Sequence, residues 1–274
     1  MHPPAGTPAA PAPVQHLPVG LCRQLTWFFS DIDDTLTTDG LIPPGAFSAL
    51  WRLSESGLRV VAVTGRPAGW CDHIARMWPV AGVVGENGAF SYVYDRTRRV
   101  MRRTLAEEED DEPARRQRLQ QVARRVLKEV PGTALAADQP FRLSDVAIDY
   151  REDVPPLPPE RVDDICRILQ SEGVRFKVSS IHVNFWLGDF DKMSGVRRFL
   201  RDQGTDWDRV SGQALFIGDS PNDEPLFAGF PCSIAVGNLR RFLPRLASLP
   251  GYITAAESAE GFQEAVDVIL EKRR

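Results

Sequence analysis

The chain of 274 residues has a formal net charge of −4, and its hydrophobic and charged fractions, 43% and 26%, are ordinary for a folded globular protein. This charge balance gives no electrostatic basis for binding nucleic acid or an anionic membrane, and no apolar run approaches the ~20 residues that span a bilayer. We therefore expect neither nucleic acid nor a membrane as a partner.

The first twenty residues, 1–20, are rich in proline and alanine and have neither the basic start nor the apolar core of a signal peptide. Their composition predicts a disordered leader. Four cysteines are scattered along the chain with no CxxC pair, a spacing that predicts reduced, structural thiols and a cytoplasmic protein. They are Cys22, Cys71, Cys166 and Cys232.

Strand and helix patterns alternate through the first part of the chain. A short apolar run at residues 27–30 predicts a buried strand. Helical patterns follow at 46–56 and 67–78, and each leads to a further strand, at 58–63 and 81–85. This order predicts an α/β fold with a doubly wound, Rossmann-like parallel sheet.

A different pattern interrupts this order over roughly residues 90–186. Alternating residues predict a hairpin at its start, and two helices and further paired strands follow, a mixture typical of an α+β lobe. Helix and strand patterns then alternate again up to the last residues. We therefore expect a core formed by residues 21–89 and 187–274, with residues 90–186 inserted as a separate lobe.

Two carboxylates follow the first strand directly, at the edge where ligands bind in open α/β sheets. Because Asp31 and Asp33 are two residues apart, an extended backbone points both side chains the same way. Two converging carboxylates repel each other unless a cation lies between them, and oxygen ligands of this kind suit Mg²⁺. Taken alone, the stretch is equally consistent with a strand that runs into an Asx-rich turn.

Further polar stretches occur in a fixed order after the first one. Two more strands end in hydroxyl or carboxylate groups, and a single lysine opens a helix. Phosphoryl transfer through an aspartyl-phosphate needs a carboxylate nucleophile, a second carboxylate as acid and base, donors and a cation for the phosphate, and ligands for Mg²⁺. The four stretches are Asp31-Ile32-Asp33-Asp34-Thr35, Thr64-Gly65-Arg66, Lys192 and Gly218-Asp219-Ser220-Pro221-Asn222-Asp223.

These stretches resemble the motifs of the haloacid dehalogenase-like (HAD) phosphatase superfamily. The large insertion between Thr64 and Lys192 resembles the cap of the Cof-like branch, which includes sugar-phosphate phosphatases and phosphomannomutases. The resemblance implies a HAD-like core with an inserted α+β cap domain. One departure is Asp34, which replaces a glycine often found there, and we interpret it as a turn residue.

The resemblance implies a role for each matching residue. Asp31 is expected to be the nucleophile. Asp33 is expected to protonate the leaving alcohol, to activate water and to touch Mg²⁺ through its backbone carbonyl. Thr64 is expected to hold a phosphoryl oxygen, with Gly65 allowing the backbone to approach. Lys192 is expected to neutralise charge gathered by Asp31 and the phosphate.

The last motif is expected to complete the Mg²⁺ site. The resemblance implies Asp219 as a direct ligand beside Asp31 and Asp33, and Asp223 as a ligand through bound water. Asn222 is expected to orient the phosphate or the nucleophile. Both Asn222 and Asp223 are also consistent with capping of the next helix.

Residues close to these motifs are candidates for binding the substrate. Arg66 either contacts substrate or pairs with an acid near the site. The triplet Glu86-Asn87-Gly88 resembles one in sugar-phosphate members of the family. In it, Asn87 either hydrogen-bonds a substrate hydroxyl or belongs to a plain turn.

The inserted lobe is expected to supply specificity for the leaving group. Arg142, His182 and Asn184 are its first candidates, although an exposed strand face is the simpler interpretation of His182. We expect changes at Arg142 or His182 to alter the preference among sugar phosphates and to spare hydrolysis of a small generic phosphate ester.

The sequence therefore predicts a Mg²⁺-dependent phosphatase that hydrolyses a small phosphate ester, most simply a sugar or polyol phosphate, through an aspartyl-phosphate. A phosphomutase of the same fold is the alternative, because it would use the same groups and return the phosphoryl group to the sugar. A catalytically silent binding protein should have lost at least one of four residues, and all four are present: Asp31, Asp33, Lys192 and Asp219. No dinucleotide or P-loop motif indicates a nucleotide cofactor.

Overall fold

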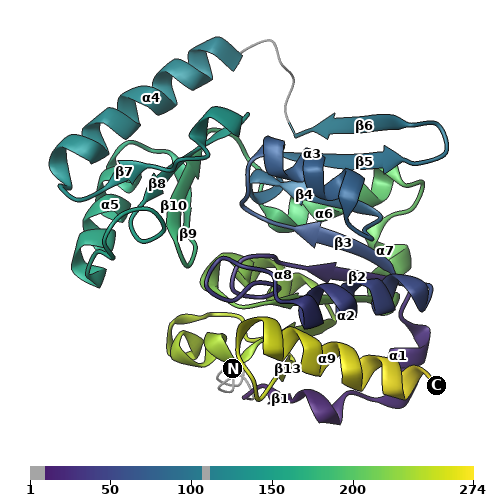
Figure 1. Cartoon of the computed structure of the whole chain (residues 1–274). Helices are drawn as coiled ribbons and strands as arrows, with labels where there is room; N and C mark the ends of the chain where they lie inside the picture. Colours follow the sequence, from purple (N-terminus) through teal and green to yellow (C-terminus); the bar gives the residue numbers. More distant parts are fainter. Residues whose placement is uncertain (1–9, 107–111) are drawn as a thin grey trace, which may run out of the picture. The chain divides into compact units, whose positions relative to one another are not determined.

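The structure, a computed structural model, describes residues 10–106 and 112–274. The chain forms two compact units, which we describe one at a time (Figure 1). The terminal unit comprises Met1–Val60 and Trp207–Arg274, and the central unit comprises Val61–Asp206. Within the described ranges, no helix is both long and apolar enough to cross a membrane.

A parallel sheet forms the centre of the terminal unit, with its strands in the order β1-β13-β12-β11-β2. Successive side chains of a strand point to opposite faces, and both faces are covered. Phe28 packs edge-on against Phe262 of α9, whereas Phe29 packs against Phe230, which follows α8. The elements are β1 (Ala12–Pro13), α1 (Val19–Gln24), β2 (Trp27–Ser30), α2 (Pro44–Glu55), α7 (Trp207–Val210), β11 (Ala214–Gly218), α8 (Glu224–Gly229), β12 (Cys232–Ala235), β13 (Tyr252–Ile253) and α9 (Ser258–Arg273).

The structure differs from the predicted disordered leader over residues 10–20, while residues 1–9 lie outside the described ranges. Strand β1 pairs in parallel with β13, and Val14 and Leu17 are almost completely buried. The side chain of Lys272, near the end of α9, donates hydrogen bonds to the carbonyl oxygens of Gln15 and Leu17. The composition of this segment did not reveal these partners, because they lie more than 230 positions away in the sequence.

The strands of the central unit belong to two sheets. In the first, β3 and β4 run parallel and β5 and β6 follow antiparallel, with helices α3 and α6 on opposite faces of the sheet (Figure 1). The second sheet is antiparallel, in the order β7-β8-β10-β9. The elements are β3 (Arg59–Val63), α3 (Ala68–Met77), β4 (Gly82–Gly85), β5 (Phe90–Asp95), β6 (Val100–Leu105), α4 (Glu112–Glu129), β7 (Ala134–Leu135), β8 (Asp145–Asp149), α5 (Pro159–Ser171), β9 (Arg175–Val178), β10 (His182–Trp186) and α6 (Lys192–Asp202).

The hairpin of β5 and β6 forms where the sequence predicts one, but it extends the sheet of β3 and β4 instead of belonging to the separate lobe. The tight turn at Glu86–Gly88 reverses the chain, so that Phe90 lies opposite Gly85 and β5 pairs antiparallel with β4. The separate antiparallel sheet of the lobe starts only at β7. The predicted boundary of the inserted lobe at residue 90 therefore precedes the start of its sheet.

The lobe sheet has one apolar and one polar face, as the alternation of its strands dictates. Val146 and Ile148 of β8, with Val183 and Phe185 of β10, pack into a core with helices α4 and α5. The intervening residues of both strands point to the opposite face and are also buried. They are Asp145, Ala147, Asp149, His182, Asn184 and Trp186.

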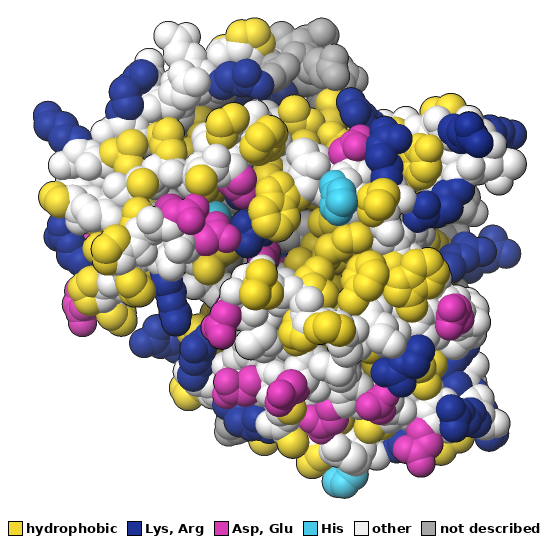
Figure 2. Space-filling model, in the orientation of Figure 1, with side chains coloured by type: hydrophobic (Ala, Val, Ile, Leu, Met, Phe, Trp, Pro, Cys, Tyr) yellow, Lys and Arg dark blue, Asp and Glu magenta, His cyan; other side chains and the backbone are white. Residues whose placement is uncertain are grey.

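Together these features confirm the predicted fold class, an α/β protein with a parallel sheet flanked by helices and a separate α+β lobe. The predicted domain boundaries remain a proposal. On the face drawn in Figure 2, acidic and basic side chains are interspersed, in keeping with the near-balanced composition.

Candidate active site

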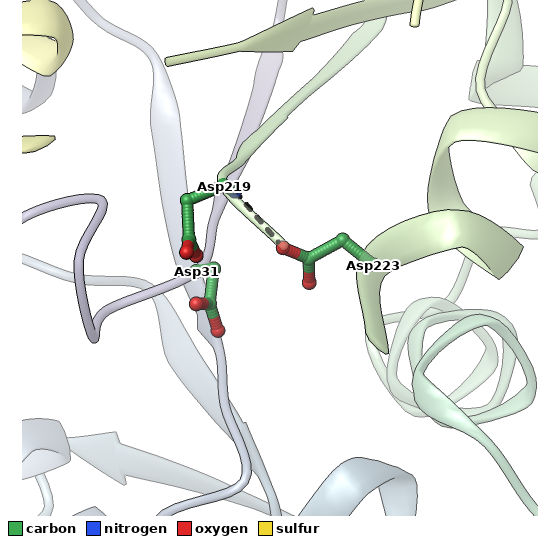
Figure 3. Close-up of side chains that lie close together, drawn as sticks. All are labelled: Asp31, Asp219 and Asp223. Carbon is green, nitrogen blue, oxygen red and sulfur yellow. Dashed lines mark hydrogen bonds between the residues drawn. The ribbon is translucent and has the colours of Figure 1, made fainter. Parts of the chain in front are cut away.

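Three buried carboxylates lie together at one edge of the terminal unit's sheet (Figure 3). Asp31 directly follows β2 and Asp219 directly follows β11, the neighbouring parallel strand. The amide of Asp31 donates to the carbonyl oxygen of Ile217 at 3.0 Å, which fixes the two strand ends side by side. Asp31, Asp219 and Asp223 each place one carboxylate oxygen within 4.8 Å of the others.

The side chain of Asp223 is fixed by the turn after β11. Its Oδ2 accepts hydrogen bonds from the amides of Asp219 at 3.1 Å and Ser220 at 3.4 Å, and the first of these is drawn in Figure 3. The hydroxyl of Ser220 donates to Oδ1 of Asn222 at 2.7 Å. Ser220 and Asp223 therefore cap this turn. The same contacts hold Asp223 beside the other two acids.

The chemistry of this donor set fits a divalent cation. Three buried carboxylates so close together repel one another in a low-dielectric site, and a cation between them would remove this cost. All the donors are oxygen atoms, the ligands that Mg²⁺ prefers. Asp31, Asp219 and Asp223 would hold such an ion.

Gly218 provides a test of this arrangement. A methyl group at position 218 would lie 2.3 Å from Oδ2 of Asp223 and 2.8 Å from a ring carbon of Phe216. We expect Gly218→Ala to lower the free energy of unfolding by about 1–3 kcal/mol, the usual cost of overpacking a buried site. Urea unfolding measures this. Gly212→Ala is the matched control, because no atom lies within 4 Å of that added methyl group. Equal stability of the two variants would contradict the described position of Asp223.

Asp33 lies in a tight turn two residues after Asp31 and is half-buried. In this turn the amides of Leu36 and Thr37 donate to the carbonyl oxygen of Ile32. Asp34 has a φ of +54°, a conformation that glycine adopts freely and aspartate tolerates better than most residues. This explains how aspartate can stand at a position where the proteins that the motif resembles often have glycine, and it supports the interpretation of Asp34 as a turn residue.

Two residues that the sequence did not single out support this turn. The hydroxyl of Thr35 donates to Oδ1 of Asp219 at 3.3 Å and so orients that carboxylate. The Nδ2 atom of Asn238 donates to the carbonyl oxygen of Asp34 at 3.0 Å. Thr35 could have been found, since it belongs to the quoted motif. Asn238 carries no signal, because 204 positions separate it from its partner.

The other predicted residues lie in the central unit, around the loop after β3. The hydroxyl oxygen of Thr64 accepts a hydrogen bond from the amide of Arg66 at 3.0 Å, which leaves the hydroxyl hydrogen to point elsewhere. The amide of Asn87 donates to the carbonyl oxygen of Thr64 at 3.1 Å. The Nδ2 atom of Asn87 is buried, lies close to Gly65 and has no hydrogen-bond partner among the described residues. A buried amide without a partner is costly, so this group is suited to a bound ligand.

Lys192 is the first residue of α6 and is buried. A capping box between Asp191 and Ser194 fixes the start of this helix. The helix approaches the turn of Glu86–Gly88 so closely that a methyl group on Gly88 would lie 2.0 Å from the carbonyl oxygen of Asp191. The central unit therefore brings the starts of α6 and of β5 close to the loop of Thr64.

Within each unit, then, the structure gathers the predicted residues. Those of the first and last motifs meet in the terminal unit, and those of the second motif, the lysine and the Glu86 triplet meet in the central unit. Comparison with known proteins indicates which family these motifs resemble. Residues 28–112 match the family model of haloacid dehalogenase-like hydrolases, a range that includes Asp31, Asp33 and Thr64. This part of the chain therefore resembles haloacid dehalogenase-like hydrolases.

Solved structures share the fold of this chain at low sequence identity. Protein 0175 of Thermoplasma acidophilum is 18% identical with a TM-score of 0.67, over 90% of this chain and 98% of that chain. A HAD/COF-like hydrolase from Plasmodium vivax is 17% identical with a TM-score of 0.67, over 93% and 99%. The sucrose-phosphatase of Synechocystis is 16% identical with a TM-score of 0.61, over 90% and 98%. A comparison with curated protein sequences gives no significant match.

Arg66 pairs with acids, one of the two alternatives that the sequence left open. Its guanidinium lies 2.8 Å from Oε1 of Glu152 and 3.6 Å from Oδ2 of Asp138. It also lies over the ring of Trp70, at 4.3 Å from the centroid. Burial alone would raise the pKa of Glu152, but hydrogen bonds from His182 and Arg66 lower it to about 2.

The lobe candidates are not exposed, contrary to the simpler interpretation of His182. This residue belongs to the polar face of the lobe sheet, and its Nε2 atom lies 3.0 Å from Oε2 of Glu152. Asn184 donates to Oδ2 of Asp145 at 2.9 Å. The pattern of β10 gave the correct alternation, but alternation alone does not reveal that both faces of a sheet are covered.

Proposed function

We propose that this protein is a HAD-like, Mg²⁺-dependent phosphatase that acts through an aspartyl-phosphate. Its substrate in this proposal is a small phosphorylated metabolite, a sugar or polyol phosphate. The observation that carries the proposal is the buried cluster of Asp31, Asp219 and Asp223 at adjacent strand ends, with Asp33 two residues after Asp31. A structural neighbour solved with sucrose and phosphate is a sucrose-phosphatase, which supports a sugar phosphate as the substrate class. The scattered cysteines support a cytoplasmic location as part of the same proposal.

The chemistry divides into two steps. In the first, a carboxylate oxygen of Asp31 attacks phosphorus, the bond to the leaving oxygen breaks, and Asp33 gives its proton to the leaving alcohol. In the second, Asp33 takes a proton from water, the water oxygen attacks phosphorus, and the Asp31 carboxylate leaves. Bound Mg²⁺ supplies positive charge that stabilises the transferring phosphoryl group.

The remaining residues bind and orient the phosphoryl group in this proposal. The hydroxyl of Thr64 donates to a phosphoryl oxygen, for which its own acceptance from Arg66 leaves the hydrogen available. Gly65 lets the backbone approach, and Lys192 neutralises charge. Asn222 orients the phosphate, and Asn87, whose Nδ2 atom is buried without a partner in the described chain, binds a substrate hydroxyl.

The activity is tested by measuring phosphate release with Mg²⁺ from a set of sugar, polyol and nucleotide monophosphates. We expect sugar or polyol phosphates to give the highest kcat/KM. Transfer of the phosphoryl group to another position of the sugar, without release of inorganic phosphate, would indicate the phosphomutase instead. No turnover of any ester would contradict both.

Asp33→Asn tests the acid and base. We expect a loss of roughly 10²–10⁴-fold in kcat with a sugar phosphate, because one group serves the leaving oxygen and then the water. The first step should lose much less with nitrophenyl phosphate, since nitrophenolate leaves without a proton. Burst kinetics separate the two steps. An equal loss of first-step rate for good and poor leaving groups would show that Asp33 only positions its neighbours.

A further inference from the structure

Glu86 is completely buried in the central unit, and its carboxylate joins two segments that are far apart in the sequence. Its Oε1 accepts from the amides of Ala68 at 3.1 Å and Leu143 at 2.8 Å, and its Oε2 accepts from those of Ser144 at 2.6 Å and Asp145 at 3.2 Å. A carboxylate has about four acceptor positions, so backbone amides use all of them. Ala68 begins α3, whereas the other three residues lead into β8 of the lobe.

The turn that carries Glu86 is fastened to the motif loop, which we define as Thr64-Gly65-Arg66. The amide of Glu86 donates to the carbonyl oxygen of Arg66 at 3.2 Å, and that of Asn87 donates to the carbonyl oxygen of Thr64 at 3.1 Å. Both turn residues have positive φ, +42° and +55°. Such conformations are strained and persist where surrounding contacts enforce them. The four amides on Glu86 and the two bonds to the motif loop are such contacts.

Arg142 reaches the same loop from the lobe. Its side chain is 1% exposed, and its Nη1 donates to the carbonyl oxygen of Gly65 at 3.0 Å. The other donors of the guanidinium are held by Asp138, at 3.0 and 3.2 Å, and Nη1 also contacts Asp145 at 2.9 Å. The residues that follow Arg142, at positions 143–145, are the ones whose amides bind Glu86, so both contacts tie the same segment to the motif loop.

We propose that Glu86 and Arg142 are positioning residues through which the inserted lobe sets the geometry of the phosphoryl-binding motif loop. This inference rests on the proposed function, in which Thr64 and Gly65 bind the phosphoryl group. It departs from the sequence-based expectation that the lobe acts on the leaving group alone. Because a small misplacement of a binding group costs up to ~10²-fold in rate, the lobe then affects every phosphate ester, including one with no sugar.

Two variants alter this network while keeping much of its shape. In Glu86→Gln, one acceptor oxygen becomes an NH₂ group that faces backbone N–H donors. In Arg142→Lys, the positive charge beside Asp138 and Asp145 stays, but the fork that reaches Gly65 is lost. The matched control is Glu172→Gln, which removes a lobe carboxylate bound to Arg118 at 2.7 Å and Arg125 at 2.5 Å and which has no contact with the motif loop.

The readouts are kcat and KM for nitrophenyl phosphate with Mg²⁺, the inhibition constant of inorganic phosphate, and the thermal unfolding midpoint. We expect both network variants to raise KM and the phosphate inhibition constant by about 10–100-fold. The control should stay within about twofold of the wild type, the scale of a solvent-screened surface pair. A role limited to stability would lower the unfolding midpoint of the two network variants and leave phosphate inhibition unchanged.

The outcomes separate this inference from the proposed function. A wild-type enzyme that hydrolyses no ester would refute the proposed function. An active wild type whose Arg142→Lys variant keeps normal phosphate inhibition would overturn the positioning role, even if Glu86→Gln failed to fold. Weakened phosphate inhibition in Arg142→Lys, with a normal unfolding midpoint, would establish it.

Discussion

Replacing Asp31 with asparagine should reduce turnover by at least ~10³-fold, the scale of losing a covalent nucleophile. The amide keeps the shape of the side chain but has no charge to attack phosphorus or to join the metal site with Asp219 and Asp223. Steady-state phosphate release with a sugar phosphate measures the effect. Asp34→Asn is the matched control, because it makes the same chemical change three residues later in the turn.

We expect the Asp34→Asn enzyme to keep most of its activity, since the fold uses the backbone of Asp34 through its positive φ and its bond to Asn238. If Asp31→Asn retained turnover close to that of the control, Asp31 would have no place in the covalent step. The two variants share a net charge, so a general electrostatic effect would alter both.

Removing divalent metal should abolish turnover, and Mg²⁺ should restore it, because in the proposed function the three buried carboxylates hold the ion that stabilises the phosphoryl group. Exhaustive EDTA treatment followed by Mg²⁺ titration measures this. Asp219→Asn should shift the Mg²⁺ titration to higher concentration, and calorimetric Mg²⁺ titration of the same variant gives a readout that is independent of activity. Full activity after chelation would contradict the assignment of the cluster as a metal site.

The control for the metal experiment is Asp39→Asn, an exposed acid in the loop after the Asp31 turn. It removes one negative charge from the same unit without touching the cluster. We expect its Mg²⁺ titration to match that of the wild type. An equal shift in both variants would mean that the cation responds to net charge and not to the cluster.

The sequence was sufficient to predict the acidic cluster, because the physical rule behind it is local. Polar residues that directly follow buried parallel strands meet at one edge of the sheet, and Asp31 and Asp219 follow strands that prove to be neighbours. Asp223 needed only the short turn after β11. The family resemblance added roles that the pattern alone could not supply, and those roles remain proposals.

The central unit shows what the pattern could not predict. The sequence drew attention to the Glu86-Asn87-Gly88 triplet but assigned its interest to Asn87. Three of the four partners of Glu86 are backbone amides 57 to 59 positions away, and a backbone amide carries no residue signature. For the same reason Arg142 was interpreted as a reader of the leaving group, whereas its donors are taken by Asp138, Asp145 and Gly65.

Two further predictions differ from the structure for a related reason: the assignment of the hairpin to the lobe, and the disorder of residues 10–20. Alternation predicts the strands of residues 90–105 correctly, but only pairing with β4 decides to which sheet they belong. Proline and alanine in the first residues suggest disorder, yet Val14 and Leu17 are buried beside α9 and β1 pairs with β13. In both cases the structure of the segment depends on a partner strand elsewhere in the chain, which the composition of the segment does not reveal.

The most direct test of the central claim is to trap the covalent intermediate. Borohydride converts an aspartyl-phosphate to homoserine, and peptide mass spectrometry locates the change. The Asp33→Asn enzyme, quenched during turnover of nitrophenyl phosphate with Mg²⁺, should carry homoserine at position 31 and nowhere else, because nitrophenolate leaves without a proton while loss of the base slows breakdown of the intermediate. An enzyme that turns over substrate yet shows no change at Asp31, or shows it at another carboxylate, would contradict the account.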